Sequence, residues 1–361
     1  MTRMVFGARM KRYYVALPPT LATKYLYLFK EFLATIILTS ILVLAIVVGR
    51  LALDNIGLLT ITLIALLGLT LGVPYYWAMT ILHPTRTLPK ITPSDLGIAH
   101  WEDVRFLSSD GVPLKGWFIS PSPASDAATL VFVHGLGSNR ADLLKEAMMM
   151  VSQGYGALLF DLRNHGTSGG SISTLGFYEA NDVRGAVLYL LSRPDVNPDR
   201  VGLVGHSMGG VAVLRAAARL PQIKAIVTES VFTSLEDNIV QGIIARTGLP
   251  PFPFAPFMVW LGERITGLRI NQIRPIDDVT RIAPCPVLFV HGEQDTTVRV
   301  SNSVKLFEAC HYPKGLYLIR HATHAELAAT EPQEFFHRVS GFLNWAVRGI
   351  ERRNAPRINV S

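Results

Sequence analysis

Gly205, Ser207 and Gly209 form the pattern G-x-S-x-G between an apolar run and an alanine-rich run. A serine at the tip of a tight strand-to-helix turn projects its hydroxyl away from the backbone, and glycines beside it let the two arms of the turn approach closely. Residues 201–204 are expected to form a buried strand, and residues 211–220 a helix. In this context the pattern predicts a nucleophilic serine at Ser207 rather than an ordinary glycine-rich turn.

A serine hydroxyl is a weak nucleophile at neutral pH and needs a base, usually a histidine that is oriented by a carboxylate. Asp295 follows the apolar run 286–290, and His324 follows the run 315–319. Loops after the carboxyl ends of parallel strands meet at one edge of a sheet, so these two residues and Ser207 are expected to meet there. Their chain order is the one associated with this topology.

Other titratable residues compete for the same two roles. Glu229 follows the strand after the serine helix and is an alternative acid. Glu293 lies beside Asp295 and is expected to be solvated. His321 is an alternative base, three residues before His324. We favour Asp295 and His324.

The elements that position these residues alternate between strands and helices. The expected strands are residues 104–107, 114–119, 129–133, 156–160, 201–204, 224–228, 286–290 and 315–319. The expected helices are residues 141–153, 178–192, 211–220, 301–310 and 332–347. Continuous apolar strands that alternate with helices indicate an α/β fold, with a mostly parallel eight-stranded sheet covered on both faces.

The N-terminal part of the chain has a different character. Residues 32–49 and 56–82 are apolar runs without a charged residue, and a membrane span needs roughly 20 such residues. We therefore predict a hairpin of two transmembrane helices. A signal peptide is disfavoured by the long basic leader and by the second run close behind the first. Basic residues flank both outer ends of the hairpin, so the positive-inside rule places the termini and the catalytic domain in the cytoplasm.

Composition excludes several classes of protein. The 361 residues are 49% hydrophobic with a formal net charge of +7, but the basic residues gather near the apolar runs and at the C-terminus. This distribution fits a membrane surface better than a nucleic acid. Cys285 and Cys310 are the two cysteines, and they show no metal-binding spacing. No phosphate loop or dinucleotide fingerprint is present, so we expect no metal and no cofactor.

The motifs together resemble those of the α/β-hydrolase family over about residues 100–348. They are His134 with Gly135, Asp161 with Arg163, His165, Gly166 and Ser168, the Ser207 pattern, His291 with Asp295, and His324. The resemblance implies that Ser207 forms an acyl-enzyme, that His324 is the general base and acid, and that Asp295 orients the imidazole. It also implies an oxyanion hole made by the backbone N–H groups of Leu136 and Met208. His134, His165 and His206 are expected to brace loops, and Asp161 and Arg163 to stabilise a loop as a pair.

The strand–helix alternation is interrupted by a segment rich in proline and apolar residues, and the resemblance implies a cap inserted there, at about residues 233–280. Its large apolar side chains either line an acyl pocket or pack the cap onto the core: Phe252, Phe254, Phe257, Met258 and Trp260. Sparse polarity in this segment favours a hydrophobic acyl group. Both interpretations of these side chains remain open at this point.

The domain organisation follows from these runs. The expected segments are a basic leader 1–31, a transmembrane hairpin 32–82, a linker 83–101, a catalytic domain 102–350 and a basic tail 351–361. Arg348, Arg352, Arg353 and Arg357 are expected to face anionic headgroups. We predict a membrane-anchored serine hydrolase that cleaves acyl esters, thioesters or lipids. The alternatives are an amidase or peptidase of the same fold, or a membrane scaffold without activity.

Overall fold

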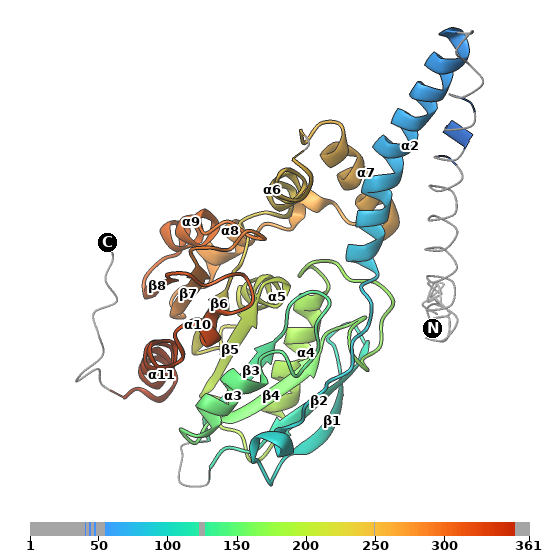
Figure 1. Ribbon diagram of the computed structural model, residues 1–361. Coiled ribbons are helices and arrows are strands. Elements are labelled where there is room, and N and C mark those ends of the chain that lie inside the picture. The colour runs from blue at the N-terminus through green and yellow to red at the C-terminus, as the bar shows by residue number, and fades with distance from the viewer. Residues whose placement is uncertain are drawn as a thin grey trace, which may run out of the picture. The chain divides into compact units, whose positions relative to one another are not determined.

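The central element of the protein is a sheet of eight strands. The computed structural model describes residues 40, 43, 44, 47, 55–122, 127–248 and 250–350. The strand order is β1-β2-β4-β3-β5-β6-β7-β8 (Figure 1). The strands are β1 (Glu102–Leu107), β2 (Pro113–Ile119), β3 (Thr129–Val133), β4 (Gly156–Asp161), β5 (Val201–His206), β6 (Ala225–Glu229), β7 (Val287–Gly292) and β8 (Lys314–Ile319). Only the pairs β1–β2 and β2–β4 are antiparallel. The predicted mostly parallel eight-stranded sheet is confirmed.

Helices cover both faces of this sheet, because successive side chains of a buried strand point to opposite sides. On one face the strands pack against α4 (Glu179–Leu191), α5 (Met208–Ala217) and α9 (Ser301–Ala309). On the other face they pack against α3 (Leu144–Val151) and α11 (Pro332–Arg348) (Figure 1). All five predicted helices are therefore present. Most ends shift by a few residues, and α5 begins directly after the serine of the turn.

The predicted cap contains helices that the sequence did not single out. They are α6 (Leu235–Thr247) and α7 (Phe254–Thr266), followed by the short turns η2 (Ile270–Gln272), α8 (Pro275–Asp278) and η3 (Val279–Arg281). The proline-rich run ends where α7 begins, and Pro256 lies in its first turn. A proline is tolerated there because the first N–H groups of a helix have no partner within it. The prolines thus start a helix instead of preventing one.

Residues 83–101 were expected to be a linker, but the structure holds them against the hydrolase core. Arg86 donates hydrogen bonds to the carbonyl oxygens of Ser168 and Gly170. Ile98 and Trp101 pack against the core cluster on the α3 side of the sheet. The segment includes a short turn, η1 (Pro93–Leu96). The segment that joins α2 to β1 is therefore fixed in place by partly buried apolar side chains and by backbone acceptors.

Helix α2 (Asn55–Leu82) corresponds to the second apolar run. Among the residues that the structure describes, one helix is long and apolar enough to cross a membrane, Thr60–Leu82, with a mean hydropathy of 1.6. The first predicted span, at residues 32–49, lies almost wholly outside the described residues, as do the leader and the tail. The chain divides into two compact units, and the part of α2 from Thr70 onward belongs to the unit that contains the sheet.

Arg348 belongs to the folded domain and not to the basic tail. It lies at the end of α11, and its guanidinium stacks over the ring of Tyr155 at 3.8 Å. It also donates a hydrogen bond to the carbonyl oxygen of Gln153. These contacts engage the guanidinium of Arg348 within the domain, and its role at lipid headgroups stays a prediction. The other three arginines of the tail lie outside the described residues.

Candidate active site

Ser207 occupies a strained turn between β5 and α5. Its φ of 52° and ψ of −120° lie in a region that non-glycine residues rarely adopt. Strain of this kind persists only where the surroundings enforce it, and it is common at functional sites. Its amide donates to the carbonyl oxygen of Glu229 on the neighbouring strand β6, and its own carbonyl oxygen accepts from Val211 in α5. The turn therefore holds the hydroxyl in a defined direction.

The two glycines of the motif are needed because the two arms of the turn nearly touch. A Cβ on Gly205 would lie 2.8 Å from backbone atoms of Gly209. A Cβ on Gly209 would overlap the carbonyl oxygens of Val133 and His134, at the end of strand β3. Backbone atoms of a central strand cannot move aside as a flexible side chain would. The close approach that the sequence pattern implies is thus a property of the structure.

Gly209→Ala is expected to destabilise the domain by roughly 1–3 kcal/mol, as overpacking usually does, and to displace Ser207. Thermal unfolding by circular dichroism measures the loss. Gly341→Ala in α11 is the matched control, because nothing lies within 4 Å of the added Cβ. It is expected to leave stability unchanged or to raise it by about 0.5–1 kcal/mol. Equal melting temperatures for the two variants would contradict the packing argument.

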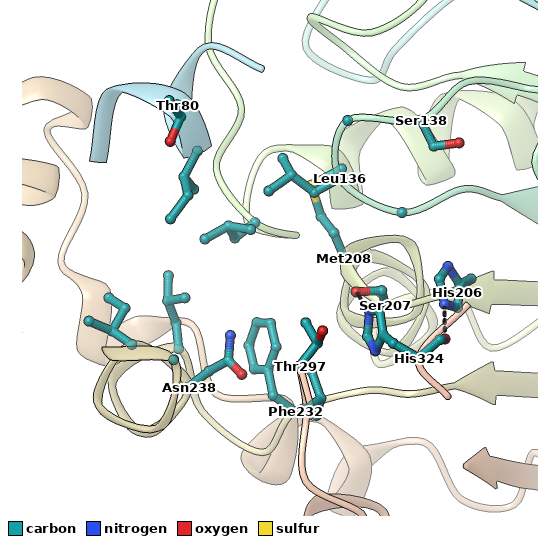
Figure 2. A pocket seen from close by; sticks show the side chains of 18 of the residues that line it. Thr80, Leu136, Ser138, His206, Ser207, Met208, Phe232, Asn238, Thr297 and His324 are labelled. Atoms are coloured by element: carbon teal, nitrogen blue, oxygen red, sulfur yellow. Dashed lines mark hydrogen bonds between the residues drawn. The ribbon is translucent and has the colours of Figure 1, made fainter. Parts of the chain in front are cut away.

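His324 connects Ser207 to Asp295 through both of its ring nitrogens. Its Nε2 lies 3.0 Å from the Oγ of Ser207, and its Nδ1 lies 2.7 Å from the Oδ2 of Asp295. Asp295 follows β7 and His324 follows β8, so both loops leave the same edge of the sheet as the serine turn. Figure 2 shows Ser207 and His324 side by side at the edge of a pocket. The structure thus brings together the three residues that the sequence predicts to act together.

Asp295 is held as a buried carboxylate. Burial by itself would raise its pKa, but hydrogen bonds from His291 and His324 and from the amide of Val298 outweigh that effect. Together they hold the pKa of Asp295 well below its usual range. The amide of Thr297 also donates to this carboxylate. The group that faces the imidazole Nδ1 is therefore an anion, which favours a proton on Nδ1 and leaves Nε2 free to accept one from the serine.

The competing candidates lie elsewhere. Glu229 is buried at the end of β6, beside the carboxyl group of Glu146. Glu293 is exposed to solvent, as expected. His321 is also exposed, with its Nδ1 3.1 Å from the amide nitrogen of Gln294. None of these three contacts the hydroxyl of Ser207 among the hydrogen bonds of the described residues.

Three histidines of the motifs brace loops around the serine. The Nε2 of His134 accepts a hydrogen bond from the amide of Leu162, and the Nε2 of His165 accepts one from Gly137. Burial lowers the pKa of His134 to about 4, so this ring is neutral and can accept. The Nε2 of His206 lies 2.9 Å from the backbone carbonyl oxygen of His324. These contacts connect the loops after β3 and β4 with each other, and the loop after β8 with the end of β5.

The expected pairing of Asp161 with Arg163 is wrong. Asp161 instead accepts hydrogen bonds from the amides of Arg140 and Thr167. Arg163 binds two other carboxylates, Asp182 and Asp110, at 2.7 and 2.6 Å. Both residues do stabilise loops, but through different partners. Closeness in the sequence suggested the pair, whereas in the folded chain each of the two side chains has its own set of partners.

A buried pair of carboxyl groups lies next to the site. Glu146 in α3 and Glu229 at the end of β6 are within hydrogen-bonding reach of each other. Burial raises the pKa of Glu146 to about 8, and burial together with the Glu146 charge raises that of Glu229 well above its usual value. The folded protein therefore keeps protons near neutral pH that the unfolded chain, with ordinary glutamate pKa values, has already released.

Glu146→Gln is therefore expected to flatten the pH dependence of stability. The raised pKa contributes stability that is complete below about pH 4.5 and is lost as the pH rises towards 8. Between pH 5 and 7.5 the wild-type melting temperature should fall more than that of the variant, by roughly 5–10 °C. Thermal melts across this range give the two slopes. Glu308→Gln, at an exposed position in α9, is the control and should keep the wild-type dependence of melting temperature on pH. If the Glu146→Gln variant also kept the wild-type dependence, the two buried carboxyl groups would be ionised in the folded protein and the prediction would be wrong.

A cavity of about 590 Å³ opens at the hydroxyl of Ser207. Its walls come from the end of α2, the loop after β3, the serine turn, α6, α7 and the loops that carry Thr297 and His324. Figure 2 shows Thr80, Asn238, Phe232 and Thr297 around the open space. Most of the lining is apolar, so its few polar groups, at the serine end and at Thr80 and Asn238, are the features that can orient a ligand.

Leu136 and Met208 line this cavity beside Ser207. Met208 is the first residue of α5, where an amide has no acceptor within the helix. Among the described residues, no backbone or side-chain acceptor takes a hydrogen bond from the amide of Leu136 or Met208. Two backbone N–H groups close to the serine are therefore available to a ligand oxygen.

Of the five cap residues expected to line an acyl pocket, only Met258 does so. Phe252 and Trp260 are 75% and 50% exposed, and Phe254 packs within the cap. Phe257 stacks on Trp260 with ring centroids 5.6 Å apart. The interpretation of these four aromatic residues as pocket lining is therefore corrected. They lie in and before the first turns of α7, and most of this helix surface faces away from the cavity.

The structure adds cavity residues that the sequence analysis missed. Trp77, Thr80 and Ile81 come from the end of α2, and Leu235 and Ile239 come from α6. The sequence analysis assigned these α2 residues to a membrane span. Their spacing places them on one face of a helix, but a sequence pattern does not tell whether such a face meets lipid or protein.

No group of three or more His, Cys, Asp or Glu residues in the described part of the chain is arranged to hold a metal ion. Cys285 and Cys310 are both free thiols, and burial raises the pKa of the Cys310 thiol to about 11. Neither lines the cavity at Ser207.

The sheet topology, the serine turn and the Ser207–His324–Asp295 hydrogen bonds define a hydrolase of the α/β class. The chain belongs to the Alpha/beta hydrolase family, whose model matches residues 130–338, more than half of the chain. The predicted family is therefore confirmed. The match spans most of the sheet and the loops that carry the three residues.

Several known proteins are similar to this chain. Uncharacterized protein YqkD of Bacillus subtilis is 28% identical over 239 residues, which cover 66% of this chain and 77% of that protein. Uncharacterized protein YfhR of Escherichia coli K12 is 29% identical over 230 residues, which cover 62% of this chain and 74% of that protein. The solved structure of the Pyrococcus furiosus esterase Pf2001 is 27% identical with a TM-score of 0.62, covering 74% of this chain and 98% of that one.

Proposed function

We propose that the protein is a serine esterase that hydrolyses carboxylic esters of apolar acyl groups through an acyl-enzyme on Ser207. The observation that carries the proposal is the continuous hydrogen-bonded series from Asp295 through His324 to Ser207, at the polar end of an apolar cavity. The likeness to the esterase Pf2001 supports an ester substrate. Acyl esters, thioesters and lipids share the reacting carbonyl group.

In the proposed reaction the Oγ of Ser207 attacks the carbonyl carbon while the Nε2 of His324 takes the hydroxyl proton. The negative charge of Asp295 stabilises the imidazolium that forms. His324 then donates its proton to the alcohol that leaves, and the acyl group stays on Ser207. Water then gives a proton to His324 and attacks the acyl carbon. The bond from the acyl carbon to the Oγ of Ser207 breaks, His324 returns the proton to this Oγ, and the carboxylic acid is released.

The amides of Leu136 and Met208 are proposed to bind the oxygen on which negative charge develops. They line the same end of the cavity as Ser207 and have no other acceptor among the described residues. Preorganised backbone donors of this kind typically contribute about 10²–10³ in rate each. The start of α5 at Met208 adds the positive end of a helix dipole.

The proposal includes membrane attachment. Helix α2 is apolar along Thr60–Leu82, and basic residues precede the first predicted span and follow α2. With the predicted first span it would form a hairpin that leaves the hydrolase domain in the cytoplasm. Alkaline extraction of membranes tests the anchor, and protease added outside intact cells tests the side. Extraction of the full chain, or cleavage of the domain from outside, would contradict this part.

Turnover of p-nitrophenyl esters by the full-length protein tests the ester activity, with p-nitroanilides of the same acyl groups as the comparison. Ester turnover that exceeds anilide turnover supports the esterase. Faster anilide turnover would favour the amidase or peptidase. Neither turnover nor labelling of Ser207 by a fluorophosphonate probe, in detergent or in lipid, would favour the scaffold without activity.

A further inference from the structure

We propose that the end of α2 and the cap helices together form a chamber for the distal part of a straight acyl chain, so that α2 sets chain-length preference. This inference rests on the proposed esterase function for its activity test. The chamber is a second cavity of about 50 Å³ beside the cavity at Ser207. A water-sized group occupies roughly 10–15 Å³ by the same measure, so a few methylene groups fit.

The two cavities share a wall. Ile81, Leu175, Leu235, Ile239 and Met258 line both of them. These side chains come from α2, from the loop before α4 and from both main cap helices. A chain that enters beside Ser207 and passes between them would reach the chamber. The shared lining therefore makes the chamber a continuation of the ester site.

The chamber lining offers no free polar partner to a ligand. Thr174 and Thr266 supply its two hydroxyl groups. The Thr174 hydroxyl donates to Glu179, and the Thr266 hydroxyl donates to the carbonyl oxygen of Gly262 in its own helix. The remaining lining is aliphatic apart from Gly262 and Met258. Such walls select alkyl groups, because burial of each methylene is favourable and a polar group would lose its hydrogen bonds to water.

Helix α2 is a fixed part of this wall. Its residues Ala78, Ile81 and Leu82 face the chamber. The carbonyl oxygen of Leu82 accepts hydrogen bonds from the amide of Ser173 and from the side chain of Asn164. Ile81 also packs on the buried cluster of the cap, together with Trp77. The end of α2 is therefore fixed to both the hydrolase core and the cap. A cavity wall must be fixed in this way if it is to discriminate between acyl chains of different length.

Two substitutions with opposite effects on chamber volume test the inference. Ala78→Leu adds three heavy atoms from α2 to a chamber of this size, and Ala78 does not line the cavity at Ser207. Leu268→Ala removes three heavy atoms from the far wall, and Leu268 also lines only the chamber. Ala346→Leu, in α11 and away from both cavities, is the matched control for added bulk.

The measurement is kcat/KM for p-nitrophenyl esters from acetate to dodecanoate, with full-length protein in lipid nanodiscs. The ratio of variant to wild type at each chain length cancels the partitioning of the ester into lipid. Ala78→Leu should lower the long-chain ratio about tenfold, the effect of losing two buried methylenes, and leave acetate within about twofold. Leu268→Ala should move the optimum to longer chains. Ala346→Leu should leave every ratio near one.

The outcomes separate this inference from the proposed function. Equal effects of Ala78→Leu at all chain lengths would overturn the chamber while the esterase stands. Where no ester is hydrolysed, binding of straight-chain fatty acids to Ser207→Ala protein is the second readout. Affinity that rises with chain length and falls tenfold in the Ser207→Ala/Ala78→Leu protein would support the chamber without the esterase. A flat affinity series, unaffected by Ala78→Leu, would overturn it.

Discussion

Ser207→Ala is expected to lower kcat for ester hydrolysis by on the order of 10⁵–10⁶, with little change in KM. The hydroxyl is the group that would form the bond to the acyl carbon, and His324 lies 3.0 Å from it. Removal of one Oγ leaves the walls of the cavity intact, so substrate binding should persist. Steady-state kinetics on a short ester measures the loss, and a fluorophosphonate probe should label the wild type but not the variant.

Ser138→Ala is the matched control, because Ser138 lines the same cavity and carries the same hydroxyl group. The structure gives its side chain no contact with the imidazole of His324, and Figure 2 shows it apart from Ser207. Its kcat should stay within a few-fold of wild type. If Ser207→Ala protein retained wild-type activity, the reaction would need another nucleophile and the acyl-enzyme proposal would fall.

Asp295→Asn is expected to lower kcat by about 10⁴ while the fold and the cavity persist. The carboxylate accepts from the Nδ1 of His324 at 2.7 Å and is held ionised by its other donors. An amide at this place can present an N–H to Nδ1, which favours the wrong tautomer of the imidazole and removes the charge that stabilises the imidazolium. Measurement of kcat across pH 5–9 tests whether the loss persists at every pH.

Glu229→Gln is the comparison for this second prediction, because Glu229 is the other acid considered for the role. Its carboxyl group is buried beside that of Glu146, and the structure shows no hydrogen bond between it and His324. The variant should keep kcat within about tenfold of wild type. The reverse result, with Glu229→Gln inactive and Asp295→Asn active, would assign the acid to Glu229.

The sequence predicted the scaffold well because its signals are local. Most of the eight strands are short apolar runs between turn residues, and the sheet buries both of their faces, so the composition of these runs was sufficient. The serine turn was predictable because its constraint is steric, as the carbonyl oxygens next to Gly209 show. Asp295 and His324 were chosen from their places after strands β7 and β8, and the structure brings them to Ser207. Their catalytic roles stay predictions.

The assignments that failed depended on contacts between distant parts of the chain. Asp161 and Arg163 were paired because they are close in the sequence. In the folded protein each buried side chain instead forms its hydrogen bonds with residues that are distant in the sequence, Arg140 and Asp182. The aromatic residues of the cap were assigned to the pocket by composition. Phe252 and Trp260 are instead exposed, because the orientation of α7 and of the segment before it decides which side chains meet the cavity.

By itself the sequence determined the fold class, the turn at Ser207 and the residues able to act with it, because strand periodicity, glycine sterics and chain order operate over short distances. Tertiary structure alone decided what encloses the serine. The composition of the end of α2 predicts a membrane span, yet its residues Trp77 and Ile81 line the cavity at Ser207. An apolar helix face gains similar free energy against lipid and against other apolar side chains. Only packing in three dimensions selects the partner.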